Sequence, residues 1–200
     1  MAALCGNHTI KRRRAGASLY RETIVRAETV VELLDLLQSS GVDSWVDGGW
    51  GVDALLGYQS RPHEDLDLVV ALNRGVGPIR EVLATHGFTL AEDQLPVRFV
   101  LSYPYLRHID FHTVTFDREG GGLQPQPSGK TFRYPPEGFV MGHIAGRPVR
   151  CISAAVQVLC HLGYEPNEKD LHDVRLLHQA FGVELPAAYR SALDEDCPKH

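Results

Sequence analysis

The stretch Trp45-Val-Asp-Gly-Gly-Trp-Gly-Val-Asp-Ala-Leu-Leu-Gly57 places an apolar segment, a glycine pair and a second apolar segment in direct succession. Residues 44–46 predict a short strand that Gly48 and Gly49 interrupt, and residues 52–56 predict a helical turn. Glycine lets the backbone approach a ligand closely, and the N–H groups that open a helix attract anions. The pattern therefore favours a phosphate-binding turn, although a glycine pair is also common in ordinary turns.

A pair of carboxylates follows Gly49 after fifteen intervening residues, in Asp65-Leu-Asp-Leu-Val-Val70. This segment predicts a strand, in which residues two apart share a face, so Asp65 and Asp67 point the same way. Two nearby carboxylates repel each other unless a cation lies between them, and oxygen ligands of this kind suit Mg²⁺. An acidic pair on a strand is also typical of a solvent-facing sheet surface, so the pair alone is weak evidence.

A third carboxylate, Asp110, lies in a predicted strand over residues 107–116. Its apolar neighbours mark the core face, so Asp110 points away from the core with His108 and His112 on its own face. If this strand lies beside the strand of residues 65–70, the three carboxylates form one cluster. The alternative is that Asp110 faces solvent.

Composition is that of an ordinary globular protein of 200 residues, with 44% hydrophobic and 22% charged residues. The formal net charge of −5 argues against a dedicated duplex-DNA binder, and the sequence contains no run of 18 apolar residues that would predict a membrane span. The four cysteines form no C-x-x-C pair, which favours reduced thiols and a cytoplasmic protein. We expect neither nucleic acid nor a membrane as partner, and the sequence leaves homodimer formation open.

Four parts are expected along the chain: a disordered basic tail over residues 1–17, a core over 18–150, a helical segment over 151–186 and a tail over 187–200. Further helices are predicted over about 20–40, 76–86, 153–162 and 168–181, with strands over 97–103 and 107–116 as an antiparallel pair and a hairpin over 143–150. Residues 120–138 contain five glycines and four prolines, which predicts a long surface loop.

Along the chain, a glycine pair is followed by a D-x-D motif and then by an aspartate on a later strand. This order resembles the pattern of the nucleotidyltransferase superfamily. Residues 45–57 and Arg61-Pro-His-Glu-Asp-Leu-Asp67 closely resemble the small antibiotic nucleotidyltransferases, especially lincosamide nucleotidyltransferases and more distantly aminoglycoside 2''-nucleotidyltransferases. Segments 146–153 and 161–164 extend the resemblance, which covers residues 25–180. We therefore expect the α/β (α+β) nucleotidyltransferase fold, with a mixed, largely antiparallel twisted sheet backed by helices and a small helical C-terminal segment.

The resemblance assigns roles to individual residues. It implies metal ligation by Asp65, Asp67 and Asp110, catalytic proton acceptance by Asp110, nucleotide binding by Gly48, Gly49, Arg61 and His63, and, more weakly, acceptor binding by His112, Tyr164 and Asp173. ATP would be the co-substrate, with two Mg²⁺ ions about 3.5–4 Å apart at the α-phosphorus. AMP would pass to a hydroxyl of a small antibiotic, a lincosamide first, and pyrophosphate would leave.

Other interpretations remain open. The same chemistry could act on an aminoglycoside, another metabolite or a protein, or the fold could serve as a non-catalytic nucleotide-binding module. His108, Asp110 and His112 on one strand face could instead bind iron or zinc in a transition-metal enzyme. Gly129-Lys130-Thr131 is not a phosphate loop, because Gln124 stands where that motif requires glycine.

Overall fold

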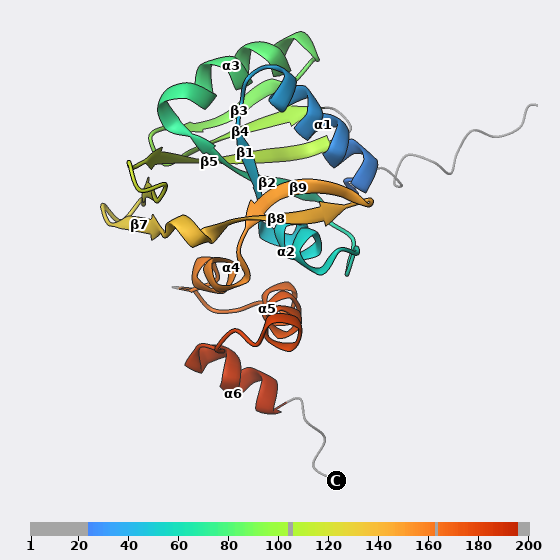
Figure 1. Ribbon diagram of the computed structural model, residues 1–200, viewed down its shortest axis with the longest axis vertical. Coiled ribbons are helices and arrows are strands. Elements are labelled where there is room, and N and C mark those ends of the chain that lie inside the picture. The colour runs from blue at the N-terminus through green and yellow to red at the C-terminus, as the bar shows by residue number, and fades with distance from the viewer. Residues whose placement is uncertain (1–23, 104–105, 163, 196–200) are drawn as a thin grey trace, which may run out of the picture.

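The computed structural model describes residues 24–103, 106–162 and 164–195, so the expected basic tail over 1–17 lies outside the described part. A mixed sheet with the strand order β3-β4-β5-β2-β1-β9-β8 forms the centre, and β6 and β7 extend it from β5 (Figure 1). Two neighbouring pairs, β2 with β5 and β1 with β9, are parallel and the others are antiparallel. The predicted α/β fold with a mixed, largely antiparallel sheet is confirmed.

The strands are β1 (Ser44–Asp47), β2 (Asp65–Ala71), β3 (Thr89–Gln94), β4 (Arg98–Tyr103), β5 (Leu106–Phe116), β6 (Gly122–Pro125), β7 (Thr131–Tyr134), β8 (Phe139–Ile144) and β9 (Arg147–Ile152). The helices are α1 (Ala27–Ser39), α2 (Gly48–Leu56), α3 (Leu72–Thr85), α4 (Ala154–Cys160), α5 (Glu168–Phe181) and α6 (Ala187–Glu195), with a 3₁₀ turn, η1, at Pro136–Gly138.

One face of the sheet is covered by α1 and α3, because both helices present an apolar stripe to it (Figure 1). Leu37 of α1 and Ile79 of α3 are buried in the same cluster as Leu66 and Leu68 of β2. Alternation along β2 then directs the aspartates to the opposite face, where α4, the β6–β7 hairpin and the later helices gather. The apolar positions of β2 thus determine which way the carboxylates point.

Three expectations about the elements are corrected. The glycine pair opens α2 instead of forming a turn before it, because Asp47 caps the helix by accepting a hydrogen bond from the Gly48 N–H group at 2.9 Å. The expected loop over 120–138 contains β6, β7 and η1. Residues 187–195, expected in a tail, form α6, whose Tyr189 is buried and donates a hydrogen bond to the backbone oxygen of His161 at 2.9 Å.

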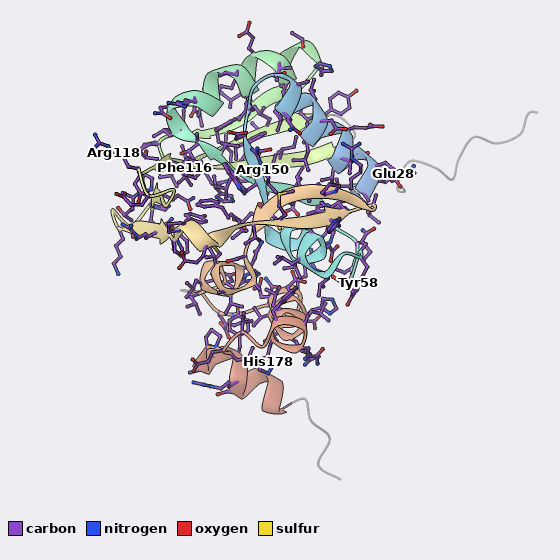
Figure 2. The ribbon with its side chains drawn as sticks, viewed as in Figure 1. Glu28, Tyr58, Phe116, Arg118, Arg150 and His178 are labelled. Atoms are coloured by element: carbon purple, nitrogen blue, oxygen red, sulfur yellow. The ribbon has the colours of Figure 1, made fainter. Side chains whose placement is uncertain are left out.

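Aromatic side chains join the β6–β7 hairpin to the sheet. Phe116 of β5, labelled in Figure 2, contacts the rings of Trp45 and Phe139 at centroid distances of 5.2 and 5.1 Å, and the rings of Trp45 and Phe139 also lie 5.1 Å apart. Tyr134 of β7 is fully buried in the same cluster. The hairpin is therefore packed onto the sheet as part of the core, which fixes its position beside the carboxylate face.

Candidate active site

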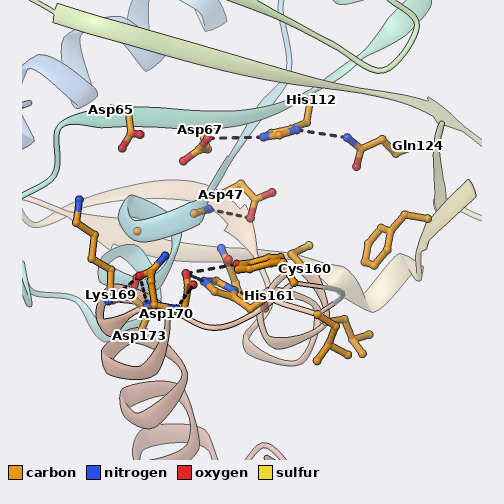
Figure 3. Close-up of a pocket in the computed structure, with 18 of the residues that line it drawn as sticks. Asp47, Asp65, Asp67, His112, Gln124, Cys160, His161, Lys169, Asp170 and Asp173 are labelled. Atoms are coloured by element: carbon orange, nitrogen blue, oxygen red, sulfur yellow. Dashed lines mark hydrogen bonds and ion pairs between the residues drawn. The ribbon is translucent and has the colours of Figure 1, made fainter. Parts of the chain in front are cut away.

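Strand register brings the carboxylates together. Asp67 of β2 lies opposite Asp110 of the parallel strand β5 and opposite Asp47 of the antiparallel strand β1. Three acidic residues therefore form a row across adjacent strands at one level of the sheet. Asp65 lies two residues before Asp67 on the same face, and Figure 3 shows both side chains extending toward the same cavity.

A group of possible metal ligands occupies the centre of this row. Ligand atoms of Asp67, Asp110 and His112 lie within 4.8 Å of one another. The structure thus brings Asp67 and Asp110 together as the sequence predicts, adds His112 and places Asp65 beside this group rather than in it. His108, the remaining residue of the alternative His–Asp–His site, is outside the group.

The clustered charges shift the pKa values of the group. Burial raises the pKa of Asp110, and the charge of Asp67 raises it further against the opposing effects of His112 and Arg98. Burial likewise raises the pKa of Asp65 and of Asp47, with a further contribution from Asp67 in each case. The negative charge of each carboxylate therefore disfavours ionisation of its neighbours. A divalent metal bound among them would relieve this repulsion.

His112 responds in the opposite sense. Burial lowers its pKa, but the interaction with Asp67 and the charges of Asp110 and Asp47 outweigh burial and raise the pKa to about 9. The Nε2 atom of His112 lies 3.6 Å from Oδ1 of Asp67, and its Nδ1 atom lies 3.3 Å from Nε2 of Gln124 (Figure 3). A cationic imidazole thus compensates part of the negative charge on this face.

Asp110 is oriented by a charged side chain from β4. Arg98 donates a hydrogen bond from Nη1 to Oδ2 of Asp110 at 2.5 Å and one from Nη2 to Glu92 at the same distance. The second oxygen, Oδ1, is buried and has no hydrogen-bond partner among the described residues. A buried carboxylate oxygen without a partner, on a residue grouped with two other possible ligands, fits a divalent metal site.

Gly48 places the start of α2 against the carboxylates. It has a φ of +56°, and a Cβ atom built on it would lie 3.0 Å from Cγ of Asp67 and closer still to Oδ2. A side chain is therefore excluded by both conformation and space. A Cβ on Gly49 would collide with Nη2 of Arg61 at 2.6 Å and with the ring of His63. These two glycines let the N-terminus of α2 meet the cavity directly.

Arg61 lines the cavity and is held by a residue of α5. Its Nε and Nη2 atoms donate to the two carboxylate oxygens of Asp173 at 2.9 and 2.5 Å. Burial lowers the pKa of Arg61, but the bonds to Asp173 outweigh it and hold the guanidinium charged. Asp173, expected at the acceptor wall, is thus engaged with Arg61 and ties α5 to the segment before β2.

His63 does not line the cavity, contrary to the expectation of contact with the nucleotide. Its ring is buried, its Nε2 atom bonds Asp53, and its centroid lies 4.7 Å from that of Trp50. Asp53 also accepts hydrogen bonds from the backbone and hydroxyl of Ser60. His63 therefore supports Gly49 from the interior, because the apolar packing of Trp50 leaves the ring no path to the cavity.

The cavity between these elements has a volume of about 420 Å³. Its first wall carries Asp65, Asp67 and the start of α2, and its opposite wall is formed by α4 and the start of α5. Tyr164 lies on this second wall and donates from its hydroxyl to Asp170 at 3.3 Å. Asp65, Asp67 and His112 face this space, and Asp110 is not among the residues that line it.

Several lining residues were not singled out from the sequence. They are Asp47, Gln124, Gln126, Phe132, Tyr134, Gln157, His161, Lys169 and Asp170. Asp47 had a visible signal, because it directly precedes the glycine pair at the end of a strand. Gln124 and Lys130 flank a tight hairpin turn in which the Gln126 N–H donates to the Lys130 oxygen at 2.8 Å, which agrees with rejecting a phosphate loop there.

Within the described ranges, no helix is long and apolar enough to traverse a lipid bilayer.

Comparison with known proteins identifies the family of this chain. The model of the family described as aminoglycoside-2''-adenylyltransferase matches residues 29–177. A lincosamide resistance protein of Staphylococcus haemolyticus is 31% identical over 145 residues, which cover 72% of this chain and 89% of that protein. A 2''-aminoglycoside nucleotidyltransferase of Escherichia coli is 29% identical over 163 residues, covering 74% of this chain and 85% of that protein.

Solved structures show the same relationship. The lincosamide adenylyltransferase LnuA with bound lincomycin matches with a TM-score of 0.69 and 30% identity, covering 77% of this chain and 97% of that one. ANT(2'')-Ia in complex with adenylyl-2''-tobramycin shares the fold, with a TM-score of 0.63, 22% identity and coverage of 84% and 98%. These matches confirm the predicted resemblance to antibiotic nucleotidyltransferases and the predicted enzyme class: this chain belongs to the aminoglycoside-2''-adenylyltransferase family.

Proposed function

We propose that this enzyme transfers AMP from ATP to a hydroxyl group of a small antibiotic, a lincosamide first, and releases pyrophosphate with the help of Mg²⁺. The observation that carries the proposal is the pairing of Asp67 with Asp110 across β2 and β5, directly beside Gly48 at the start of α2. Carboxylates at this position suit a metal-bound triphosphate, and the N–H groups that open α2 beyond Gly48, whose own N–H bonds Asp47, suit its oxygens.

Asp65, Asp67 and Asp110 would hold the metal. Their crowding, the raised pKa values of Asp65 and Asp110 and the unpaired Oδ1 of Asp110 are the features that fit Mg²⁺ there. When bound, Mg²⁺ would neutralise phosphate charge and make a coordinated hydroxyl more acidic. Two ions, shared through these three residues, remain our expectation for the complete site.

Asp110 would accept the proton of the attacking hydroxyl. Arg98 donates to Oδ2 of Asp110, and Asp110 lies in the same group of possible ligands as Asp67 and His112. Burial raises the pKa of Asp110, which makes it a stronger base than an exposed aspartate. The bond between the hydroxyl oxygen and the α-phosphorus forms as the bond to the bridging oxygen of pyrophosphate breaks, and Gly48, Gly49 and Arg61 lie where they can stabilise the departing charge.

The relatives support a lincosamide as the first acceptor. The Staphylococcus haemolyticus protein, 31% identical to this chain, is named for lincosamide resistance, and LnuA, at 30% identity, was solved with lincomycin bound. The 2''-aminoglycoside nucleotidyltransferase of Escherichia coli follows at 29%. An aminoglycoside is the second candidate, because the matching family model carries that description.

The free thiols of Cys151 and Cys160 agree with the expected cytoplasmic location.

The test is incubation of the purified chain with ATP, Mg²⁺ and separate lincosamides and aminoglycosides, followed by mass spectrometry for a gain of AMP. We expect a lincosamide to gain one AMP and pyrophosphate to appear in equal amount. Asp110→Asn is the inactive control, because the amide retains size but cannot accept the proton. Modification of aminoglycosides alone would replace the acceptor, and no nucleotide consumption with any acceptor would contradict the proposal.

A further inference from the structure

We infer that the cavity is polarised, with a phosphate end at Arg61 and Lys169 and an acceptor end formed by the β6–β7 hairpin around Phe132. The inference rests on the proposed function and deepens it, because it assigns the two substrates to opposite ends. It also gives the acceptor a chemical class: a hydroxylated ring compound with an apolar part.

The phosphate end is defined by the cations of the cavity. Among the described residues that line it, Arg61 and Lys169 supply the lysine and arginine side chains. Both lie close enough to Asp65 to lower its pKa against the effect of burial. Two cations beside the outer carboxylate place positive charge where the β- and γ-phosphates of a metal-bound nucleotide would extend.

Lys169 is the more adaptable of these cations. Asp173 holds Arg61 by two hydrogen bonds, whereas Nζ of Lys169 lies 4.0 Å from Glu64 on an exposed side chain. Figure 3 shows Lys169 extending from α5 toward the side of the cavity where Asp65 lies. Its flexible stem can move to a phosphate oxygen at little cost, so we assign Lys169 to the terminal phosphates.

The acceptor end has a different chemistry. The hairpin contributes Gln124, Gln126, Phe132 and Tyr134 to the lining, and α4 contributes Leu159. This set contains two amides, two aromatic rings and an aliphatic side chain, and no acidic residue. An apolar ring with hydroxyl groups would find both stacking surface and hydrogen bonds in this set, whereas the carboxylates of the cavity lie on β1, β2 and α5.

Contacts within the hairpin hold this end in register with the carboxylates. The Tyr134 hydroxyl donates to Oε1 of Gln124 at 2.9 Å, and Gln124 reaches His112, which is 3.6 Å from Asp67. Phe132 packs edge-on against Tyr134 with centroids 4.8 Å apart, and its own ring is half-buried. An acceptor that contacts Phe132 would thereby be held at a fixed position relative to the metal group where AMP is transferred.

The experiment separates the two ends with Lys169→Gln and Phe132→Ala. Arg190→Gln is the control for loss of an exposed cation, and Arg133→Ala is the control for truncation on β7, since both side chains are exposed and lie outside the cavity lining. Isothermal titration calorimetry measures binding of a non-hydrolysable ATP analogue with Mg²⁺, and of lincomycin, and steady-state assays give KM for each substrate. Phe132→Leu retains an apolar side chain in case alanine disturbs the hairpin, and thermal melting verifies folding.

We expect Lys169→Gln to weaken nucleotide binding by about tenfold and to leave lincomycin binding within about twofold. Phe132→Ala should weaken lincomycin binding by about tenfold with nucleotide binding unchanged, and Phe132→Leu should recover part of the loss. If the wild type transfers AMP but both variants affect both ligands equally, or neither, the inference is wrong and the proposed function stands. A wild type that binds the nucleotide but no lincosamide contradicts both the proposed acceptor and the assignment of Phe132.

Discussion

Gly48→Ala should damage the active site in two ways that can be measured separately. The backbone at Gly48 has a φ of +56°, a conformation that costs an alanine about 1 kcal/mol more than a glycine. The new Cβ would also lie 3.0 Å from Cγ of Asp67 and 3.2 Å from its Cβ, with Oδ2 closer still. The carboxylate of Asp67 must therefore move by roughly 1 Å to restore ordinary contact distances.

The two effects appear in different measured quantities: the displacement of Asp67 lowers the rate of AMP transfer, and the backbone strain lowers Tm. A displacement of about 1 Å at the reacting centre costs on the order of 10²-fold in rate. The backbone cost acts on the free energy of unfolding, and for a chain of this size about 1 kcal/mol lowers Tm by roughly 2–4 °C. We therefore expect Gly48→Ala to fold with a modestly lower Tm and to transfer AMP about 100-fold more slowly.

Gly57→Ala is the matched control, because Gly57 ends the same helix with a φ of +78° and has open space where a Cβ would be added. It should show the same loss of Tm with activity within about twofold of wild type. Differential scanning fluorimetry gives Tm, and initial rates of AMP transfer at saturating substrates give kcat. If Gly48→Ala is as active as Gly57→Ala, the close approach of α2 to Asp67 is not needed for catalysis.

Further predictions concern the surrounding charges. Asp67→Asn and Asp110→Asn should each reduce kcat for AMP transfer by about 10²–10⁴-fold, because each removes a carboxylate of the metal group; a kcat close to the wild-type value in either variant would contradict this. Asp173→Asn should lower the free energy of unfolding by about 2 kcal/mol, since Arg61 loses its partner, and an unchanged urea midpoint would show that the pair contributes nothing. In metal-free buffer, His112 stabilises the fold fully below pH 6.5 and loses this contribution as pH rises through about 9, so Tm should fall across that range. His112→Gln should flatten the decline, and an equally steep decline in this variant would assign it to other groups.

Alternation along the strands made much of the site predictable. The apolar residues of β2 and β5 mark the core face, so the opposite orientation of Asp65, Asp67 and Asp110 follows from the sequence alone. The predicted carboxylate cluster required β2 and β5 to be neighbours in the sheet. The structure pairs these two strands in parallel. The resemblance to nucleotidyltransferases rested on the order of the glycine pair, the D-x-D motif and Asp110, and chiefly on residues 45–57 and 61–67.

Other features depend on contacts between distant residues. Arg61 and Asp173 are 112 positions apart, and periodicity carries no information about such a pair. The edge strand β3 is exposed along its whole length and shows no apolar alternation, so it was missed. The glycines and prolines of residues 120–138 indicated a loop, but aromatic packing of Phe132 and Tyr134 folds this segment into a hairpin. The tertiary contacts of these two aromatic residues thus outweighed the tendency of the glycines and prolines to interrupt regular structure.

The central claim is that carboxylates from β2 and β5 bind the same metal beside Gly48. The most direct measurement is anomalous scattering from crystals of the full chain soaked with Mn²⁺ and a non-hydrolysable ATP analogue. We predict a manganese peak within about 2.0–2.4 Å of carboxylate oxygens of both Asp67 and Asp110, with the triphosphate along the N-terminus of α2. A peak bound by residues of one strand alone, or a nucleotide bound away from Gly48, would contradict the account.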